Sequence, residues 1–168
     1  MNMSDLNTIK TIDKIIIDAN VLIYVFCPLN HRKYELFISH YTDTLNNIKN
    51  ANASVFVNSL IISEFINRWL RMDFQKTNFT DFKTEYRSGD RYKKTIKSIL
   101  RELKKFYLNW NVQKLNDNFP NIDIISKYEN FPESDFNDII IAENAITNNC
   151  KILTQDNDFS QYGVVVIK

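Results

Sequence analysis

The sequence has 168 residues, of which 44% are hydrophobic and 24% are charged, with a formal net charge of +1. A chain of this length buries about two-thirds of its unfolded surface, so we expect one hydrophobic core without stapling disulfides. No apolar run approaches the roughly 20 residues of a membrane helix, and the first residues, MNMSDLNTIKTIDK, lack the apolar core of a secretory signal. These properties argue against a membrane protein and favour a single domain over residues 1–168 in the cytoplasm.

The first predicted strand is a run of β-branched residues, Ile15 to Ile17, within the stretch KIIIDANVLIYVF. Consecutive apolar residues without alternation are typical of a strand that is covered on both faces in a parallel sheet. Asp18 follows this strand at its carboxyl end, the edge where open α/β sheets bind their ligands. On this stretch alone, the simpler interpretation is that Asp18 or Asn20 caps the helix that follows.

The spacing of apolar residues predicts the remaining elements in chain order. Helices are expected over residues 21–26, 31–49, 59–72, 81–107, 119–128 and 135–148, the fourth with a break near Ser88 and Gly89. Strands are expected over residues 53–57, 110–115, 151–154 and 164–167, with a turn at QDNDF, residues 155–159. Strands that alternate with helices predict an α/β fold, a doubly wound, mostly parallel sheet of about five strands flanked by helices.

The charge is distributed unevenly, and a basic helical arm at about residues 81–108 stands out. Residues 83–105 carry nine basic and three acidic side chains, a net charge of +6, so the remainder carries −5. This pattern predicts contact with a polyanion, whereas the simpler alternative is a solvated helix face. The candidate nucleic-acid-binding residues are Arg91, Lys93, Lys94, Lys97 and Arg101.

Acidic residues recur where the predicted elements meet the carboxyl edge of the sheet. Asp18 and Asp156 follow strands, Glu64 lies in the first turns of an apolar helix, and Asp138 lies in the first turn of another. Carboxylates gathered in one site repel each other at neutral pH unless some bind protons or a cation is present. Oxygen ligands with open positions favour Mg²⁺ or Mn²⁺, which suit metal-assisted phosphodiester hydrolysis.

Four segments of the sequence resemble the acidic motifs of PIN domains, in the same order along the chain. They are DANVLIY at 18–24, SEFINR at 63–68, DFNDIIIAENA at 135–145 and LTQDNDF at 153–159. The resemblance implies a Mg²⁺- or Mn²⁺-dependent ribonuclease that cleaves single-stranded RNA by metal-activated water. It also implies that the chain is a candidate toxin of a VapC-like toxin–antitoxin pair, with an antitoxin protein or a second copy of the chain as further partners.

By match to these motifs, Asp18, Glu64, Asp138 and Asp156 take the catalytic and metal-binding roles, with Asn20 and Ser59 as polar supports. Asp135 competes with Asp138 as a ligand, and Asp158 competes with Asp156. For Asp135 and Asp158 we favour helix capping and an Asx turn instead.

Two other functions are alternatives to the ribonuclease. A phosphatase of the haloacid-dehalogenase type also places an Asp after its first strand, but it usually needs a second Asp where this chain has Asn20. A non-catalytic RNA-binding or protein-interaction module is the alternative from a different class, and the complete set of acids argues against it.

Overall fold

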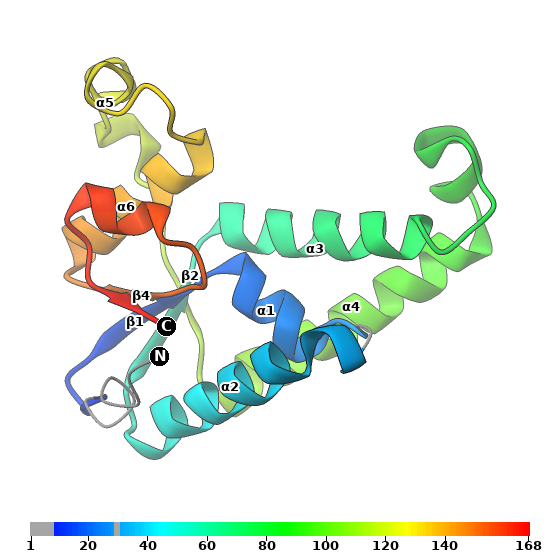
Figure 1. Ribbon diagram of the computed structural model, residues 1–168, viewed down its shortest axis with the longest axis horizontal. Helices are drawn as coiled ribbons and strands as arrows, with labels where there is room; N and C mark the ends of the chain where they lie inside the picture. Colours follow the sequence, from blue (N-terminus) through cyan, green and yellow to red (C-terminus); the bar gives the residue numbers. More distant parts are fainter. Residues whose placement is uncertain (1–8, 29–30) are drawn as a thin grey trace.

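The computed structural model describes residues 9–28 and 31–168. Its centre is a sheet of five parallel strands in the order β3-β2-β1-β4-β5 (Figure 1). The strands are β1 (Lys14–Ile17), β2 (Ser54–Val57), β3 (Gln113–Lys114), β4 (Lys151–Leu153) and β5 (Val166–Ile167). The predicted fold class is confirmed, whereas the single-domain organisation of residues 1–168 stays a prediction.

The central strand β1 has the burial that its apolar run predicts. Ile16 lies opposite Phe56 of β2 on one side and Ile152 of β4 on the other. Ile15, Ile16 and Ile17 are each no more than 1% exposed. Because both neighbours are parallel to β1, the carboxyl ends of the three strands meet at one edge of the sheet.

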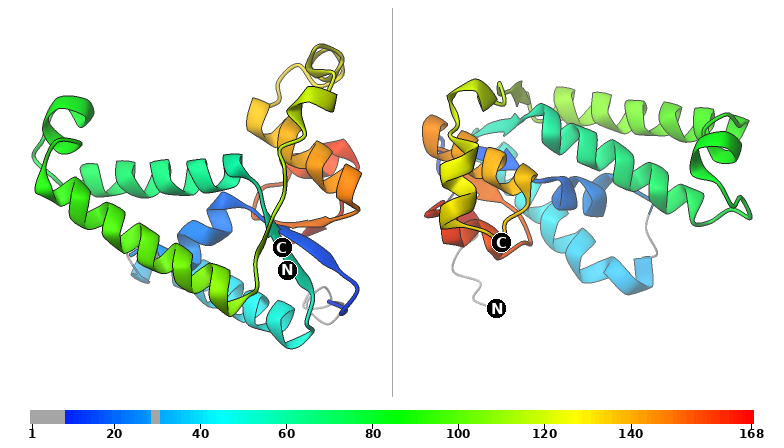
Figure 2. Two further views of the ribbon diagram at one scale, coloured as in Figure 1. Left: turned by 180° about the vertical axis from the view of Figure 1, so that it is seen from behind. Right: turned by 90° about the horizontal axis from the view of Figure 1, so that it is seen from above.

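Helices connect the strands and cover the sheet. The α-helices are α1 (Ala19–Phe26), α2 (His31–Asn50), α3 (Ser59–Phe74), α4 (Asp90–Asn109), α5 (Ile124–Asn130) and α6 (Phe136–Asn148). Right-handed crossovers place α1 to α4 on one face of the sheet and α6 on the other. Figure 2 shows α6 across the strands from α2 and α4. None of the described helices has an apolar stretch long enough to cross a lipid bilayer.

Helices α3 and α4 pack side by side and form an arm that projects from the sheet (Figure 1). Phe65 and Trp69 of α3 and Ile99 and Phe106 of α4 are buried in the hydrophobic core. This burial stabilises the arm, while the solvent-facing sides of both helices carry charged residues. The arm contains the predicted basic segment.

The tip of the arm is held by one acidic residue, Asp73. Its carboxylate accepts two hydrogen bonds from Arg91, at 3.0 and 2.8 Å, one from Tyr86 at 2.8 Å and one from Thr95 at 2.9 Å. The hydrogen bond with Arg91 is the main reason why the pKa of Asp73 lies below its ordinary value. The network explains why a polar residue is tolerated where α3, α4 and the turn between them meet.

The predicted helix over residues 81–107 is interrupted where the sequence indicated. A π-helical turn, η2 (Phe82–Tyr86), precedes α4, and Gly89 is the N-cap of α4. A Cβ at Gly89 would lie 3.3 Å from the carbonyl oxygen of Glu85, so a larger residue would crowd this corner. The close approach explains why the chain places its break at glycine.

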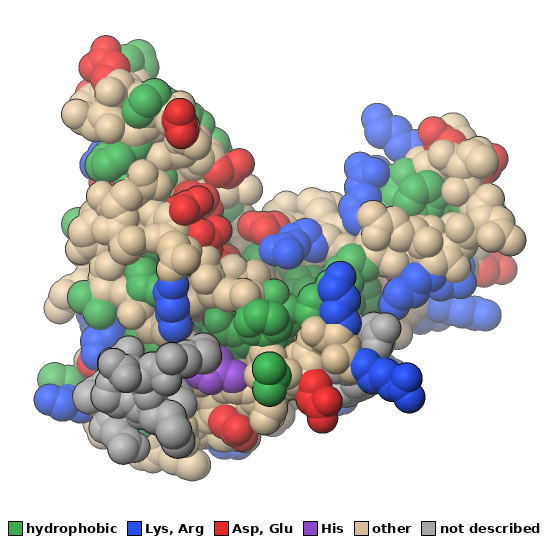
Figure 3. All heavy atoms as spheres, viewed as in Figure 1, with side chains coloured by type: hydrophobic (Ala, Val, Ile, Leu, Met, Phe, Trp, Pro, Cys, Tyr) green, Lys and Arg blue, Asp and Glu red, His purple; other side chains and the backbone are tan. Residues whose placement is uncertain are grey.

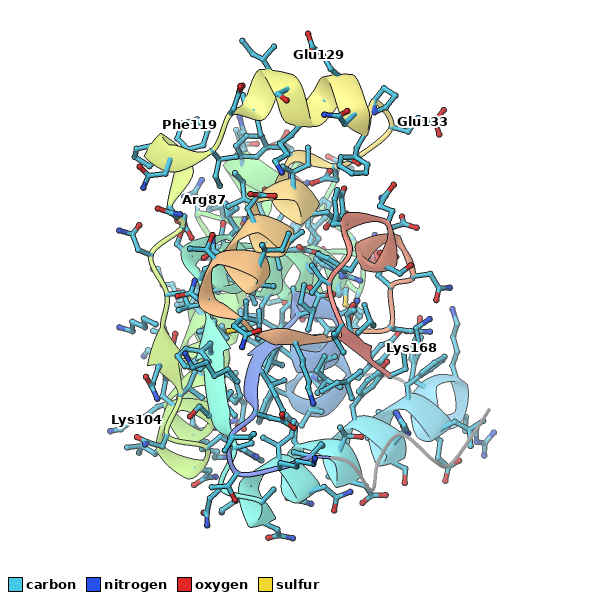
Figure 4. The ribbon with its side chains drawn as sticks, turned by 90° about the vertical axis from the view of Figure 1, so that its left-hand side faces the viewer. Arg87, Lys104, Phe119, Glu129, Glu133 and Lys168 are labelled. Atoms are coloured by element: carbon cyan, nitrogen blue, oxygen red, sulfur yellow. The ribbon has the colours of Figure 1, made fainter. Side chains whose placement is uncertain are left out.

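Two predicted elements have the wrong bounds. Instead of one helix over residues 119–128, the chain forms a 3₁₀ turn, η3 (Phe119–Asn121), and then α5, because the Asp123 side chain accepts a hydrogen bond from the Ser126 amide and starts a new helix. Helix α5 stands apart from the sheet, with Glu129 and Glu133 pointing away from the body (Figure 4). The predicted strand 110–115 is reduced to β3, since α4 continues to Asn109 and Asn111 adopts a left-handed conformation with φ of 47°.

Candidate active site

Asp18 lies at the carboxyl end of β1 and is only 6% exposed. It is the N-cap of α1, and its Oδ1 accepts a hydrogen bond of 2.6 Å from the amide of Ala19. The capping role expected from the local sequence is therefore present in the structure. The second carboxylate oxygen, Oδ2, accepts a hydrogen bond from Thr154, the residue after β4, so Asp18 also links the ends of β1 and β4.

Thr154, the residue after β4, is the polar centre of this edge. Its hydroxyl accepts hydrogen bonds of 3.0 Å from the Asn20 side chain and from the amide of Asp156. A hydroxyl has one hydrogen to donate, and here it donates to Asp18 Oδ2 at 2.5 Å. Thr154 thus holds Asp18, Asn20 and Asp156 together, and it was missed by the sequence analysis because a buried threonine after a strand resembles an ordinary core residue.

Glu64 lies one and a half turns into α3 and is partly exposed. Its Oε1 forms an ion pair of 3.1 Å with Arg68, one turn further along the helix. The negative charge of Glu64 raises the pKa of Asp18, so the two carboxylates face the same region. An apolar helix therefore presents one acidic and one basic side chain to this edge of the sheet.

Asp135 and Asp138 lie at the start of α6 but have different surroundings. Asp135 is the N-cap, and its Oδ1 accepts a hydrogen bond of 2.8 Å from the amide of Asn137. Asp138 is partly buried in the first turn and is not engaged in a hydrogen bond among the described residues. The capping role preferred for Asp135 is confirmed, which leaves the Asp138 carboxylate open to other partners.

In the loop after β4, the Asx turn is made by Asp156 and not by Asp158. Asp156 Oδ1 accepts a hydrogen bond of 2.9 Å from the amide of Asp158, so the turn is made by Asp156, and the expectation that Asp158 makes it is wrong. Asp158 is exposed and begins the 3₁₀ turn η4 (Asp158–Tyr162), which replaces part of the predicted turn over residues 155–159. One carboxylate oxygen of Asp156 is thus used locally.

Ser59 contacts a different acid from the ones that it was expected to support. Its amide donates a hydrogen bond of 3.1 Å to Asp117, and its hydroxyl also donates to that carboxylate. The Asp117 carbonyl accepts a hydrogen bond of 2.8 Å from Asn144, which is fully buried in α6. Asp117 and Asn144 therefore tie the loop after β3 to α3 and α6, an arrangement that no local sequence pattern indicated.

The carboxylates influence each other electrically across the carboxyl edge. Burial raises the pKa of Asp18 to about 6, and the charge of Glu64 adds to the increase. Burial raises the pKa of Asp138 to about 7, with further contributions from the charges of Asp135, Asp18, Asp156 and Glu64. Such mutual effects require proximity. Figure 3 shows acidic side chains around the hollow between the α5–α6 side and the α3–α4 arm.

The carboxylate oxygens at this edge of the sheet suit a hard divalent cation whose other coordination positions are filled by water or substrate. No three Asp, Glu, His or Cys side chains within residues 9–28 and 31–168 form a group that could hold a metal ion by themselves. Mg²⁺ is commonly bound through only one or two carboxylates, with water and substrate phosphates completing its coordination. A cation near Asp18 and Asp138 would also stabilise their ionised forms, which burial and, to a smaller extent, neighbouring negative charges disfavour. The assignment of ligands among the six candidate acids stays a prediction.

The candidate nucleic-acid-binding residues on α4 differ in how far they are engaged. Arg91 is bound to Asp73, Lys93 lies 3.4 Å from Asp90, and Arg101 lies 3.1 Å from Glu102. Lys94 and Lys97 are exposed and form no ion pair among the described residues. Arg91 therefore stabilises the tip of the arm, and its role in nucleic-acid binding stays a prediction with those of the other four.

Replacing Thr154 tests its role as the polar centre. We expect Thr154→Val to lower the free energy of unfolding by about 1–3 kcal/mol, because the isosteric side chain leaves Asp18 Oδ2, the Asn20 amide and the Asp156 amide without their partner. Thr154→Ser keeps the hydroxyl and should cost markedly less. Urea denaturation of the three proteins measures the difference, and equal losses for Val and Ser would contradict the role of the hydroxyl.

The raised pKa values predict how stability depends on pH when no divalent ion is present. The folded chain holds a proton on Asp138 up to about pH 7, whereas the unfolded chain releases it near pH 4. The resulting stability is complete below about pH 4 and is lost as the pH rises through 7. In EDTA, the melting temperature should fall between pH 5 and pH 8, and Asp138→Asn should be more stable than the parent at pH 8 by about 1–2 kcal/mol. Identical pH profiles for the parent and the variant would refute this assignment.

Comparison with known proteins places the chain in a family. A search of curated proteins found no match. The fold is similar to that of one chain in the crystal structure of VapBC2 from Rickettsia felis bound to a DNA fragment from its promoter. The two chains are 14% identical, the alignment covers 92% of this chain and 97% of that one, and the TM-score is 0.57, so the likeness concerns the fold. The PIN domain model matches residues 15–165, and the chain therefore belongs to the PIN domain family.

Proposed function

We propose that this chain is a Mg²⁺- or Mn²⁺-dependent endoribonuclease that hydrolyses phosphodiester bonds of single-stranded RNA. PIN domains are generally nucleases, which supports hydrolysis of a nucleic acid. The observation that carries the proposal is the pKa of Asp138, which burial raises first and the charges of Asp135, Asp18, Asp156 and Glu64 raise further, as expected for acids that share one edge of the sheet. A purely structural edge would have no reason to concentrate carboxylates that destabilise it.

In this proposal, Asp18, Glu64, Asp138 and Asp156 hold the cation, and Asp135 and Asp158 lie in the adjacent turns. The cation, when bound, lowers the pKa of water and stabilises negative charge on a phosphoryl oxygen. The chain itself orients the acids: Thr154 and the Ala19 amide fix Asp18, while Arg68 restrains Glu64.

We further propose that the chain acts with a protein partner, as the toxin of a toxin–antitoxin pair in the cytoplasm. The structurally similar chain comes from a VapBC complex bound to promoter DNA, which supports an antitoxin partner. We also keep a homodimer as a proposal. Exposed apolar residues on α2 and α4, Leu36, Leu100 and Leu108, offer surfaces for such contacts. A non-catalytic binding module remains the alternative, and the test of cleavage distinguishes the two.

Cleavage of RNA is the direct test of the proposed activity. We expect purified protein to cut unstructured RNA with Mn²⁺ or Mg²⁺, to leave 5′-phosphate and 3′-hydroxyl ends, and to lose activity in EDTA. Asp18→Asn should lower the cleavage rate by about 100-fold or more, because it removes charge from the site. Asp43→Asn, an exposed acid on α2, is the control and should cleave like the parent. Failure to cut varied RNAs, or full activity of Asp18→Asn, would refute the proposal.

Salt dependence tests whether the basic arm contacts RNA. Changing Lys93, Lys94 and Lys97 together to alanine should reduce the slope of log affinity against log salt by about 2, since each phosphate contact on a single strand contributes about 0.7. The matched triple change to arginine keeps the charge and should keep the slope. An unchanged slope in the alanine variant would assign the arm to protein contacts.

A further inference from the structure

Two adjoining cavities form a groove along one side of α3. The first, of about 410 Å³, lies between α1, α2 and α3 and includes Tyr34, Arg71 and Gln75 in its lining. The second, of about 390 Å³, is lined by the loop that carries Asp156 and Asp158. Tyr24 and Arg68 line both cavities, so the two adjoin each other. We call this feature the α3 groove. It leads from the acidic edge of the sheet toward the tip of the arm.

The first cavity of the α3 groove is basic, whereas Asp156 and Asp158 line the second. Arg68 and Arg71 line the first cavity, and no acidic residue does. Arg68 is paired with Glu64, whereas Arg71 has no ion-pair partner among the described residues. The guanidinium of Arg71 lies 4.2 Å from the centre of the Phe82 ring, which orients its plane and leaves its N–H edges to bind an anion. The groove is therefore suited to phosphate.

The same groove presents aromatic surfaces. Tyr24 and Tyr34 lie 6.0 Å apart in a tilted arrangement. Tyr24 stacks on both Phe37, at 5.0 Å, and Tyr41, at 5.7 Å, so Tyr34 is the ring that the groove offers to a ligand. The Tyr24 hydroxyl donates a hydrogen bond of 2.5 Å to Gln155, which fixes the ring next to the acidic loop. Lys33 lies 5.1 Å above the Tyr34 ring and adds a positive charge at the rim. In Figure 3, hydrophobic side chains are exposed over α1 within the hollow, with basic side chains beside them.

We propose that the α3 groove binds the nucleotides of a single-stranded RNA that lie next to the phosphate being cleaved. Arg71 binds a backbone phosphate, and the Tyr34 ring stacks on an unpaired base. The inference rests on the proposed ribonuclease function and deepens it, because it assigns the path of the substrate and gives a reason why the substrate is single-stranded. Bases within a duplex are already stacked on each other and cannot stack on Tyr34.

Charge complementarity favours RNA over a protein segment as the occupant. Arginine and tyrosine side chains around a groove are typical of single-strand binding sites, where cations follow the backbone and aromatic rings accept any base. The first cavity also adjoins the cavity of Asp156, so a chain held in the groove reaches the acidic edge without crossing the arm. A peptide or a second copy of this chain is the competing occupant.

Binding without catalysis tests the proposal directly. The probe is a fluorescein-labelled decamer of uridylate, and its affinity is measured by anisotropy in EDTA across a range of salt concentrations. We expect Arg71→Gln to weaken binding about five- to tenfold and to lower the salt slope by about 0.7. Tyr34→Leu should weaken binding about tenfold without a change in slope, because it removes stacking alone. Arg32→Gln, an exposed arginine on α2 outside the groove, should bind like the parent.

Three outcomes would overturn the inference. The first is unchanged affinity in Arg71→Gln and Tyr34→Leu when both variants melt at the temperature of the parent. The second is a change in oligomeric state, measured by sedimentation, with unchanged affinity for RNA, which would assign the groove to a protein contact. The third is a parent protein that does not bind the decamer.

Cleavage of a short substrate separates this inference from the proposed function. The probe is the dinucleotide UpU, which has a single phosphodiester bond; the parent should cut it, and Arg32→Gln, outside the groove, should cut it at the parental rate. If the parent binds the decamer through the groove but cuts neither RNA, the ribonuclease proposal fails and the groove assignment stands. If UpU is cut and the groove variants bind RNA normally, the reverse holds.

Discussion

Repulsion between carboxylates at the carboxyl edge of the parallel sheet is the constraint around which this structure is arranged. Asp18 is almost buried at the end of the central strand, where an ion costs more than it does in water. Two donors, the Ala19 amide and the Thr154 hydroxyl, offset part of that cost. Neither donor carries a full charge, and burial raises the pKa of Asp18 to about 6. Burial also raises the pKa of Asp138 to about 7, so ionising either acid lowers the stability of this edge.

The acid at the tip of the arm, Asp73, has the opposite surroundings and is partly buried. Asp73 receives a bidentate arginine, a tyrosine hydroxyl and a threonine hydroxyl, and its pKa is lowered. A complete shell of donors makes this carboxylate a structural element that joins α3 to α4. The contrast matters for function: the chain can satisfy an acid fully where it needs rigidity, and it leaves Asp138 without a hydrogen-bond partner among the described residues at the site proposed for catalysis.

Sequence patterns predicted the elements that depend on local chemistry. The apolar run Ile15–Ile17, the acids after strands and the break at Gly89 were visible because each reflects a steric or solvation rule that acts over a few residues. The contacts of Ser59 with Asp117, the position of Thr154 and the commitment of Arg91 to Asp73 were not, since each joins residues that are distant in sequence or depends on which face of a helix is turned inward. The prediction that Asp158 makes the Asx turn was also wrong, because both candidates are aspartates and either one makes that turn equally well.

Arg68 connects the acidic edge to the α3 groove, and the strength of its ion pair determines what it can do there. The pair with Glu64 joins residues one helical turn apart, with side chains 48% and 32% exposed. Such pairs contribute only about 0.3–0.5 kcal/mol, because water competes for both partners. Arg68 can therefore exchange Glu64 for another singly charged anion at little cost.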